Sequence, residues 1–396
     1  MVIYLLVRSA LLDIYSEIIE IFKERKFIRA EITLPTYICS IGCHMFNFMN
    51  KHKQIYWEGD TIPDMRLHIF MVTIPGFGKT YTINQFMSKY NGLLHGSTID
   101  VSKIGSLTSA GLVGSVKSTP DGQTIFHKGT LEKKANFILG SDEFSNITTS
   151  AKTSHSGNLI NDLLSALDDG QMNKGQSGGD VDYETFATIW GATQPGRYEL
   201  KSGLPRRFVF VIYMPDVGDV YKFRQSRRDA KNVKVDVKKI LNFKVELEKR
   251  KEEIDTVLEG IVFTDEWYDY INQHFATHYE DILYERIALG YHLMKCETIP
   301  KIIRITLDDE LKFILEQQFA ARLQIARGVD KIKIMEVFKN VKSIKYTELL
   351  QLLLTFALPE KYILTSLDAL KANKIIKIED GIVFNMNYEA DKRDLR

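Results

Sequence analysis

The chain has 396 residues, 44% of them hydrophobic and 26% charged, so it is long enough for two or three domains and apolar enough to form their cores. This composition excludes a wholly disordered chain. Fifty-two basic and 51 acidic residues leave a net charge of +1, which excludes a protein that is basic over its whole surface, so any contact with nucleic acid has to be local.

Two features of the sequence indicate a reducing, intracellular compartment. The apolar start at residues 1–12 is interrupted by an arginine, is shorter than the roughly 20 residues of a membrane span, and has no small-residue cleavage site after it. The three cysteines, Cys39, Cys43 and Cys296, cannot form a disulfide framework. No second ligand pair follows Cys39, Cys43 and His44 at zinc-finger spacing, so we interpret these thiols as buried. We expect a cytoplasmic protein without a membrane partner.

The first part of the chain is predicted to form helices and then a strand, a loop and a helix. Residues 13–25 and 36–48 are compatible with two helices, which we read as an N-terminal helical lead-in. Residues 66–73 form a short apolar run, which a Pro/Gly turn and a helix-compatible stretch at 79–90 follow directly.

Three further apolar runs, at 135–140, 185–191 and 208–214, resemble the first in lacking alternation. Helix-length segments separate these four strands, which predicts a parallel sheet covered on both faces and therefore an α/β fold. Beyond the sheet, residues 221–251 are rich in Lys and Arg and patterned as helix, which is typical of a solvated helical face. Residues 264–328 look entirely helical.

The last part of the chain has the pattern of a winged-helix module. Helices are predicted at 332–338, 347–354 and 359–371, and two short strands at 375–378 and 382–384 flank an Asp-Gly turn. Three helices followed by a hairpin are typical of this module. We therefore expect four parts: a helical lead-in at 1–60, a nucleotide-binding core at 61–220, a helical linker and lid at 221–328, and a winged-helix domain at 329–396.

A phosphate-binding loop is predicted between the first strand and the helix after it. The segment TIPGFGKT, from Thr73 to Thr80, differs from the pattern GxxxxGK[ST] only in its first residue. Its glycines let backbone N–H groups face a phosphate at a helix N-terminus, Lys79 can reach the outer phosphates, and the Thr80 hydroxyl can hold magnesium. The predicted ATP-binding residues are Pro75, Gly76, Phe77, Gly78, Lys79, Thr80 and Tyr81. We expect ATP and Mg²⁺ as the cofactors.

Two adjacent acids, Asp142 and Glu143, follow the second apolar run. A carboxylate at the end of a buried strand can hold magnesium through water, while its neighbour orients the water that attacks a phosphate. Because a phosphate loop precedes them, we predict that Asp142 is a metal ligand and Glu143 a catalytic residue of the Walker B type.

From about residue 66 to 215 these parts resemble the AAA+ motor of the minichromosome maintenance (MCM) replicative helicases, including divergent versions on mobile elements. The matching segments stand in the family's order: SLTSAGL at 106–112, an expected hairpin insertion at 113–124, DEF at 142–144, a helix and hairpin tip at 163–174, ATQP at 192–195, GRY at 196–198 and LPRRF at 204–208. The resemblance implies an AAA+ P-loop NTPase fold, a hexameric ring, and ATP bound between neighbouring protomers.

The resemblance also implies roles for residues outside the phosphate loop. Gln194 stands where the family has its sensor asparagine and keeps an amide that can position water. Arg207 would be an arginine finger acting on the neighbour's γ-phosphate, for which Arg206 is an alternative. Arg286, at the start of an apolar helical stretch, is similar to the family's sensor 2 arginine.

Single-stranded DNA in the ring channel is the partner that the resemblance implies. Lys174, in a Gly/Ser-rich stretch, looks like the pore-loop lysine that grips a phosphate backbone, and Lys117 and Lys128 flank the other insertion. Six copies of one lysine would focus a positive field in the channel even though the protomer is neutral. The winged helix could bind duplex DNA, or equally could dock proteins or regulate the motor.

Departures from the family pattern leave more than one function open. Thr73 replaces the first glycine of the phosphate loop, and the roughly 65 residues before the motor are too few for the zinc-bearing, OB-fold N-terminal region of cellular MCM proteins. This suggests a minimal or replicon-encoded relative. The favoured function is an ATP-dependent DNA helicase or translocase acting in replication. The alternative is an AAA+ initiator, loader or remodelling switch without processive unwinding, and a winged-helix regulator with a degenerate nucleotide site is a third.

Overall fold

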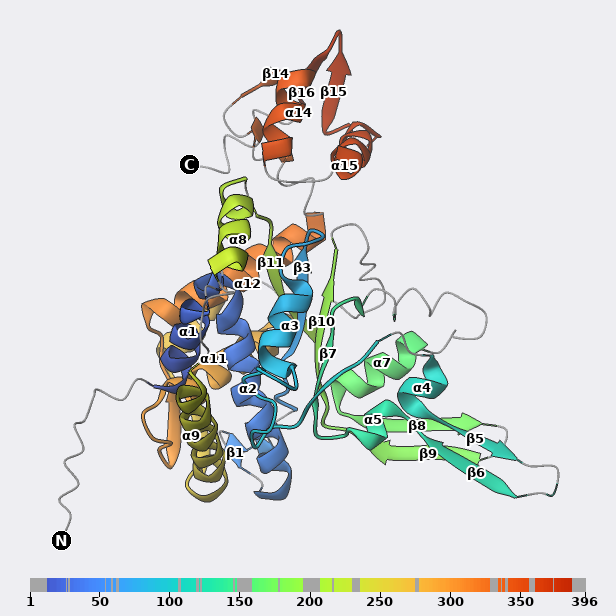
Figure 1. Cartoon of the computed structure of the whole chain (residues 1–396), viewed down its shortest axis with the longest axis vertical. Helices are drawn as coiled ribbons and strands as arrows, with labels where there is room; N and C mark the ends of the chain where they lie inside the picture. The colour runs from blue at the N-terminus through green and yellow to red at the C-terminus, as the bar shows by residue number, and fades with distance from the viewer. Residues whose placement is uncertain are drawn as a thin grey trace.

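The computed structural model covers the whole chain and describes most of residues 13–386 (Figure 1). The residues outside this description are 1–12, 26, 28, 54, 58–59, 62–63, 106–107, 119–120, 122, 145–146, 148–158, 177–178, 195–206, 216, 230–235, 275–277, 328–333, 336, 339–340, 356–359, 373 and 387–396. In addition, nothing is said of the side chains of 48–53, 56–57, 60–61, 118, 176, 217, 227, 274, 278–280, 323–327, 355, 360–362, 365 and 369.

A five-stranded parallel sheet forms the centre of the molecule, with strand order β11-β3-β10-β7-β4. Its strands are β3 (His68–Thr73), β4 (Val101–Lys103), β7 (Ile138–Ser141), β10 (Thr188–Thr193) and β11 (Phe208–Tyr213). The four predicted strands are confirmed. The edge strand β4 was not predicted, because its three residues are partly exposed and include no apolar run.

Each central strand divides its side chains between two buried cores. In β3, Ile69 and Met71 belong to one core, whereas Phe70 and Val72 belong to the other. Successive side chains of a strand point to opposite faces, so a strand that is covered on both faces reads as a continuous apolar run. The predicted α/β fold, with a parallel sheet covered on both faces, is therefore confirmed.

Helices from both ends of the chain cover one face of the sheet (Figure 1). They are α1 (Ile14–Glu24), α2 (Ala30–Lys53), α3 (Lys79–Met87), α9 (Val237–Thr256), α10 (Asp265–His274), α11 (His278–Lys295) and α12 (Asp309–Arg327). Helix α2 is longer than predicted and contains Pro35. It crosses α11 closely, because a Cβ on Gly290 would lie 2.2 Å from the Cys39 carbonyl oxygen. The thiols of Cys39 and Cys43 are buried, as predicted.

The other face carries short helices and two hairpins that project together from the body (Figure 1). The helices are α4 (Ser109–Val113), α5 (Thr130–Lys133) and α7 (Leu159–Asp168), and the hairpins pair β5 (Gly114–Ser118) with β6 (Thr124–Lys128) and β8 (Gln171–Gln176) with β9 (Gly179–Glu184). The hairpin expected at 113–124 is therefore present, slightly displaced along the chain. The Tyr183 hydroxyl donates to the Val113 carbonyl (2.9 Å) and ties the second hairpin to the first.

A second, mixed sheet lies among the helices, in strand order β13-β12-β1-β2. Its strands are β1 (Tyr56–Trp57), β2 (Asp60–Thr61), β12 (Gly260–Phe263) and β13 (Ile302–Ile305). The prediction that 264–328 is entirely helical was wrong at β13. Here exposed Ile302 and Arg304 alternate with buried Ile303 and Ile305, which is the period of a half-buried strand. The helical stretch predicted at 221–251 is divided between α8 (Val217–Asp229) and α9.

The C-terminal unit, residues 334–386, contains a three-stranded antiparallel sheet in the order β14-β16-β15. Its elements are β14 (Ser343–Lys345), α14 (Tyr346–Thr355), α15 (Glu360–Ala372), β15 (Ile376–Glu379) and β16 (Ile382–Asn385). Two predicted helices and the hairpin are present, β14 was not predicted, and the helix expected at 332–338 is described only in part. Among the described residues of the chain, none of the helices has the length and apolarity that crossing a membrane requires.

Candidate nucleotide-binding site

The loop between β3 and α3 has the backbone shape of a phosphate cradle. Gly76 and Gly78 have φ angles of +83° and +89°, which favour glycine, and the Phe77 N–H donates to the Ile74 carbonyl (3.3 Å). Gly78 is the N-cap of α3 and no side chain caps this helix end. The N-terminus of α3 faces the loop, where the helix dipole favours an anion.

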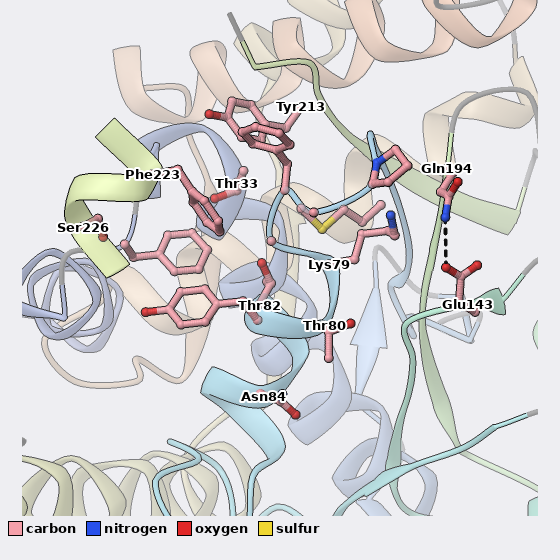
Figure 2. Close-up of a pocket in the computed structure, with 17 residues that line it drawn as sticks. Thr33, Lys79, Thr80, Thr82, Asn84, Glu143, Gln194, Tyr213, Phe223 and Ser226 are labelled. Carbon is pink, nitrogen blue, oxygen red and sulfur yellow. Dashed lines mark hydrogen bonds between the residues drawn. The ribbon is translucent and has the colours of Figure 1, made fainter. Parts of the chain in front are cut away.

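Lys79 and Thr80 begin α3 and face the ends of the neighbouring strands (Figure 2). Lys79 is only 7% exposed, and its Nζ donates to the Thr73 carbonyl (3.3 Å) at the end of β3. The Thr80 hydroxyl donates to Asp142 Oδ2 (2.7 Å). The loop residues predicted from the sequence are thus brought together with Asp142.

Glu143 and Gln194 complete the polar side of the site. They follow β7 and β10, and β10 lies between β3 and β7, so the carboxyl ends of the three parallel strands stand at one edge of the sheet. Gln194 Nε2 donates to Glu143 Oε1 (3.2 Å), as the dashed line in Figure 2 marks. Glu143 Oε2 is buried without a hydrogen-bond partner among the described groups. One carboxylate oxygen is therefore held by the amide, and the other can accept a hydrogen bond from water.

The next residue, Phe144, anchors this carboxylate. Its ring lies 5.7 Å from those of Phe70 and Phe208, in edge-to-face contacts within the core. Gly191 leaves the space that Phe144 fills, because a Cβ there would lie 2.9 Å from the ring. The close packing fixes the backbone that carries Glu143 at the sheet edge.

The oxygen atoms of Thr80 and Asp142 fit magnesium. A hydroxyl and a carboxylate are hard oxygen ligands, and Mg²⁺ is usually held by one or two protein carboxylates together with waters and substrate phosphates. Thr80 lines the cavity beside the phosphate loop, and Asp142 is held against it by the hydrogen bond between them. When bound there, the ion would neutralise charge on the phosphates.

A cavity of about 670 Å³ joins this polar side to a group of aromatic rings (Figure 2). Tyr81 stacks on Phe27 with 5.6 Å between ring centroids and 16° between ring planes, and Phe77 lies 5.5 Å from Phe223. The buried Thr82 hydroxyl also lines the cavity and has no hydrogen-bond partner among the described groups. A flat, apolar ligand group with some polar edge, such as a nucleobase, fits this end.

Most of this aromatic end was not predicted from the sequence. Phe77 and Tyr81 were among the predicted residues. The other three rings, Phe27, Tyr213 and Phe223, come from the α1–α2 corner, the end of β11 and α8. An ion pair between Arg29 and Asp219 (3.2 Å) joins that corner to α8, so two distant segments enclose the cavity together.

Arg207 does not reach the cavity of its own protomer. It precedes Phe208, which pairs with His68 at the start of β3, whereas the phosphate loop follows Thr73 at the other end. Six residues of strand at about 3.3 Å each put the Arg207 backbone roughly 20 Å from the start of the loop. Its guanidinium forms two hydrogen bonds with the Asp168 carboxylate. The predicted action on a neighbour's nucleotide stays a prediction, and Arg206 lies outside the described residues.

Arg286 is not brought to the cavity. It lies on α11, is buried, and its Nη2 donates to the Asp64 carbonyl (2.6 Å). Burial lowers the pKa of its guanidinium, and Asp64 opposes that shift. Because α11 packs against α2 in the helical core, Arg286 is a core residue in this structure, and its sensor role stays a prediction.

Lys174 is not presented as an exposed contact for DNA. It lies within β8, opposite Val181, and its Nζ donates to Asp162 Oδ2 (2.7 Å) and to the Ser109 hydroxyl (2.5 Å). Its side chain is 18% exposed. The ion pair fastens the hairpin to α7 and α4 instead of leaving the lysine to a phosphate backbone. The loop between β8 and β9, residues 177–178, lies outside the described part of the chain.

The other residues predicted to contact DNA lie on the first hairpin. Lys117 on β5 is exposed, and Lys128 on β6 forms an exposed ion pair with Glu132 (2.9 Å). In contrast, the exposed residues of β9 include Asp180, Asp182 and Glu184, so the second hairpin presents an acidic strand.

Comparison with models of known protein families gave no match, and a search of curated proteins found no similar sequence. The site is therefore interpreted from its own geometry.

Proposed function

We propose that this protein is a nucleoside triphosphatase of the AAA+ type that hydrolyses ATP with Mg²⁺. The observation that carries the proposal is the convergence of a phosphate loop, the Thr80–Asp142 pair and the Glu143–Gln194 pair at the ends of three adjacent parallel strands. Ligands bind at this edge of open α/β sheets. The order of helices and strands in the C-terminal unit supports a winged-helix module.

Each residue of the site has a distinct role in this proposal. The loop N–H groups and Lys79 bind the phosphates, and Thr80 and Asp142 hold the metal ion. Glu143, held by Gln194, orients a water molecule and accepts its proton. The water oxygen forms a bond to the γ-phosphorus while the bond to the β–γ bridging oxygen breaks, which gives ADP and phosphate.

The substitution Glu143→Gln tests the hydrolytic role. The variant keeps the groups that bind phosphate and metal but loses the carboxylate that accepts the proton. We expect ATP affinity to stay within about threefold and turnover to fall by about 10²–10⁴-fold. Glu132→Gln is a matched control, because Glu132 pairs with Lys128 on the hairpin side and does not line the cavity. Turnover like that of the wild type in Glu143→Gln would remove Glu143 from the mechanism.

We further propose that ATP hydrolysis drives DNA translocation by a hexameric ring of MCM type. The order of motifs supports this proposal, and so does the position of Arg207, which lies at the opposite end of the strands from the phosphate loop of its own protomer. Strand displacement with and without ATP, together with the native mass of the assembly, tests it. A monomer that hydrolyses ATP at the full rate would contradict the shared site.

A second candidate is an AAA+ switch that remodels DNA or protein without processive unwinding, and the Lys174–Asp162 ion pair favours it. A motor that grips DNA with Lys174 loses DNA-stimulated hydrolysis and unwinding in Lys174→Ala, whereas a switch keeps its activity. After Lys174→Ala alone, the buried Asp162 carboxylate keeps the hydrogen bond from the Ser109 hydroxyl but has lost its cationic partner. The double variant Lys174→Ala/Asp162→Asn removes that buried charge. Lys249→Ala, on an exposed face of α9, is the control for loss of charge alone.

A further inference from the structure

The core of the C-terminal unit extends to the phosphate loop. Ile74 is 3% exposed and belongs to the same apolar cluster as Ile334 and Phe338, and Phe77 and Met214 pack against that cluster. Figure 1 shows the C-terminal unit, drawn in red, beyond the ends of β3 and β11, where the loop begins. The phosphate loop is therefore covered on one side by a separate structural unit.

The contact holds both ends of the turn that shapes the loop. The Phe77 N–H donates to the Ile74 carbonyl (3.3 Å), and Pro75 and Gly76 between them are exposed. Gly76 has a positive φ angle, and a glycine loses more backbone freedom on ordering than any other residue. Anchoring Ile74 and Phe77 reduces that loss before a phosphate arrives.

Phe77 also connects the C-terminal unit with the rest of the cavity. Its ring packs against the unit and lies 5.5 Å from Phe223 of α8, and both rings line the cavity. A contiguous set of packed side chains thus leads from the C-terminal core through Phe77 to the aromatic end of the site.

We propose that the C-terminal unit regulates the nucleotide site by docking on Ile74, Phe77 and Met214, and that docking holds the phosphate loop in its nucleotide-binding shape. The inference rests on the proposed function, because it takes the cavity to bind a nucleotide. A loop ordered in advance binds more tightly. By linkage, a bound nucleotide strengthens docking by the same factor by which docking strengthens nucleotide binding.

Hydrogen exchange of the full-length wild type with and without ADP and Mg²⁺ tests this reciprocity without any substitution. We expect amide exchange in the loop, in α14 and in the sheet of the C-terminal unit to slow by about fivefold or more when ADP binds. The remote hairpin of β5 and β6 is the internal reference and keeps its exchange rates.

The substitution Met214→Lys tests docking itself. Met214 packs both against the C-terminal unit and against the core on the hairpin side of the parallel sheet, and it does not line the cavity. A lysine there puts a charge into the apolar contact, and unchanged exchange in the hairpin of β5 and β6 shows that the sheet core is intact. We expect faster exchange in the C-terminal unit without ADP, and ADP affinity lowered by about fivefold or more. Met386→Lys is the matched control, because Met386 belongs to the same unit and is largely exposed.

The outcomes separate this inference from the proposed function. If ADP binds but leaves exchange in the C-terminal unit unchanged, and Met214→Lys binds ADP as tightly as the wild type, the regulation is overturned and the nucleotide site stands. If the wild type does not bind ADP, the proposed function fails and the regulation falls with it. Slower exchange with ADP together with weaker binding by Met214→Lys supports the inference.

Discussion

The buried His44 gives the fold a pH dependence whose size follows from the structure. Its Nε2 lies 3.2 Å from the Asn136 carbonyl oxygen, which can only accept, so Nε2 carries the proton and Nδ1 accepts from the Thr188 hydroxyl (2.8 Å). Burial lowers the pKa of His44 to about 4 from 6.5. The folded protein therefore keeps this imidazole neutral over a range in which the unfolded chain binds a proton.

The sign and the size of the effect follow from linkage. Because the folded pKa is lowered, stability is fully present above pH 6.5 and is lost as the pH falls toward 4. A shift of about 2.5 pH units at 1.36 kcal/mol each removes about 3 kcal/mol between pH 7 and pH 4. That is a large part of the roughly 5–15 kcal/mol that stabilises a typical protein. His68, which accepts a hydrogen bond from the Ile189 N–H, has a pKa well below its usual value and adds to the loss in the same direction.

Urea unfolding at several pH values measures this contribution. Between pH 7 and pH 4, the wild type should lose about 3 kcal/mol more of its free energy of unfolding than His44→Gln loses. This difference does not depend on how stable the variant is at pH 7. His127→Gln, on the exposed strand β6, is the matched control substitution. Equal pH dependence in His44→Gln and the wild type would refute the assignment of the lowered pKa to His44.

Three further predictions concern the site and its support. Arg207→Ala and Lys79→Ala, each inactive alone, should recover part of the ATPase when mixed, because some interfaces then pair an intact loop with an intact finger; mixed oligomers without recovered activity would exclude the shared site. Tyr81→Ala removes a ring that lines the cavity and should weaken ATP binding by about tenfold in a calorimetric titration, and unchanged affinity would place the base elsewhere. Gly191→Ala puts a methyl group 2.9 Å from Phe144, so it should lower the urea midpoint by an amount worth about 1–3 kcal/mol and also lower turnover; a neutral effect on both would contradict the anchoring role of Phe144.

The polar side of the site was predictable because its signals are local in the sequence. Each central strand is a short apolar run, and the residues that follow it, such as Lys79 after β3 and Glu143 after β7, stand at one edge of a parallel sheet. Pattern and position therefore identify them together. The same apolar runs predicted that both faces of the sheet are covered, because a strand that is buried on both sides does not alternate apolar and polar residues.

The remaining features depend on packing between distant segments. In the sequence, Phe27 and Phe223 cannot be distinguished from aromatic residues of the core. Only the fold brings both of them to the cavity. The sequence around Lys174 predicts an exposed lysine, whereas its ion-pair partner Asp162 comes from a different element and holds the side chain half-buried. Arg286 begins an apolar helical stretch, but the direction in which it points depends on the close crossing of α11 and α2.

Phosphate release from ATP by the purified full-length protein is the most direct measurement of the proposed activity. The wild type should release phosphate only when Mg²⁺ is present, and Lys79→Ala should lose about 10²–10³-fold in rate because the charge that faces the phosphates is gone. Lys89→Ala, at an exposed position just after α3, should match the wild type. Absence of release by the wild type, or release by Lys79→Ala at the wild-type rate, would contradict the proposal.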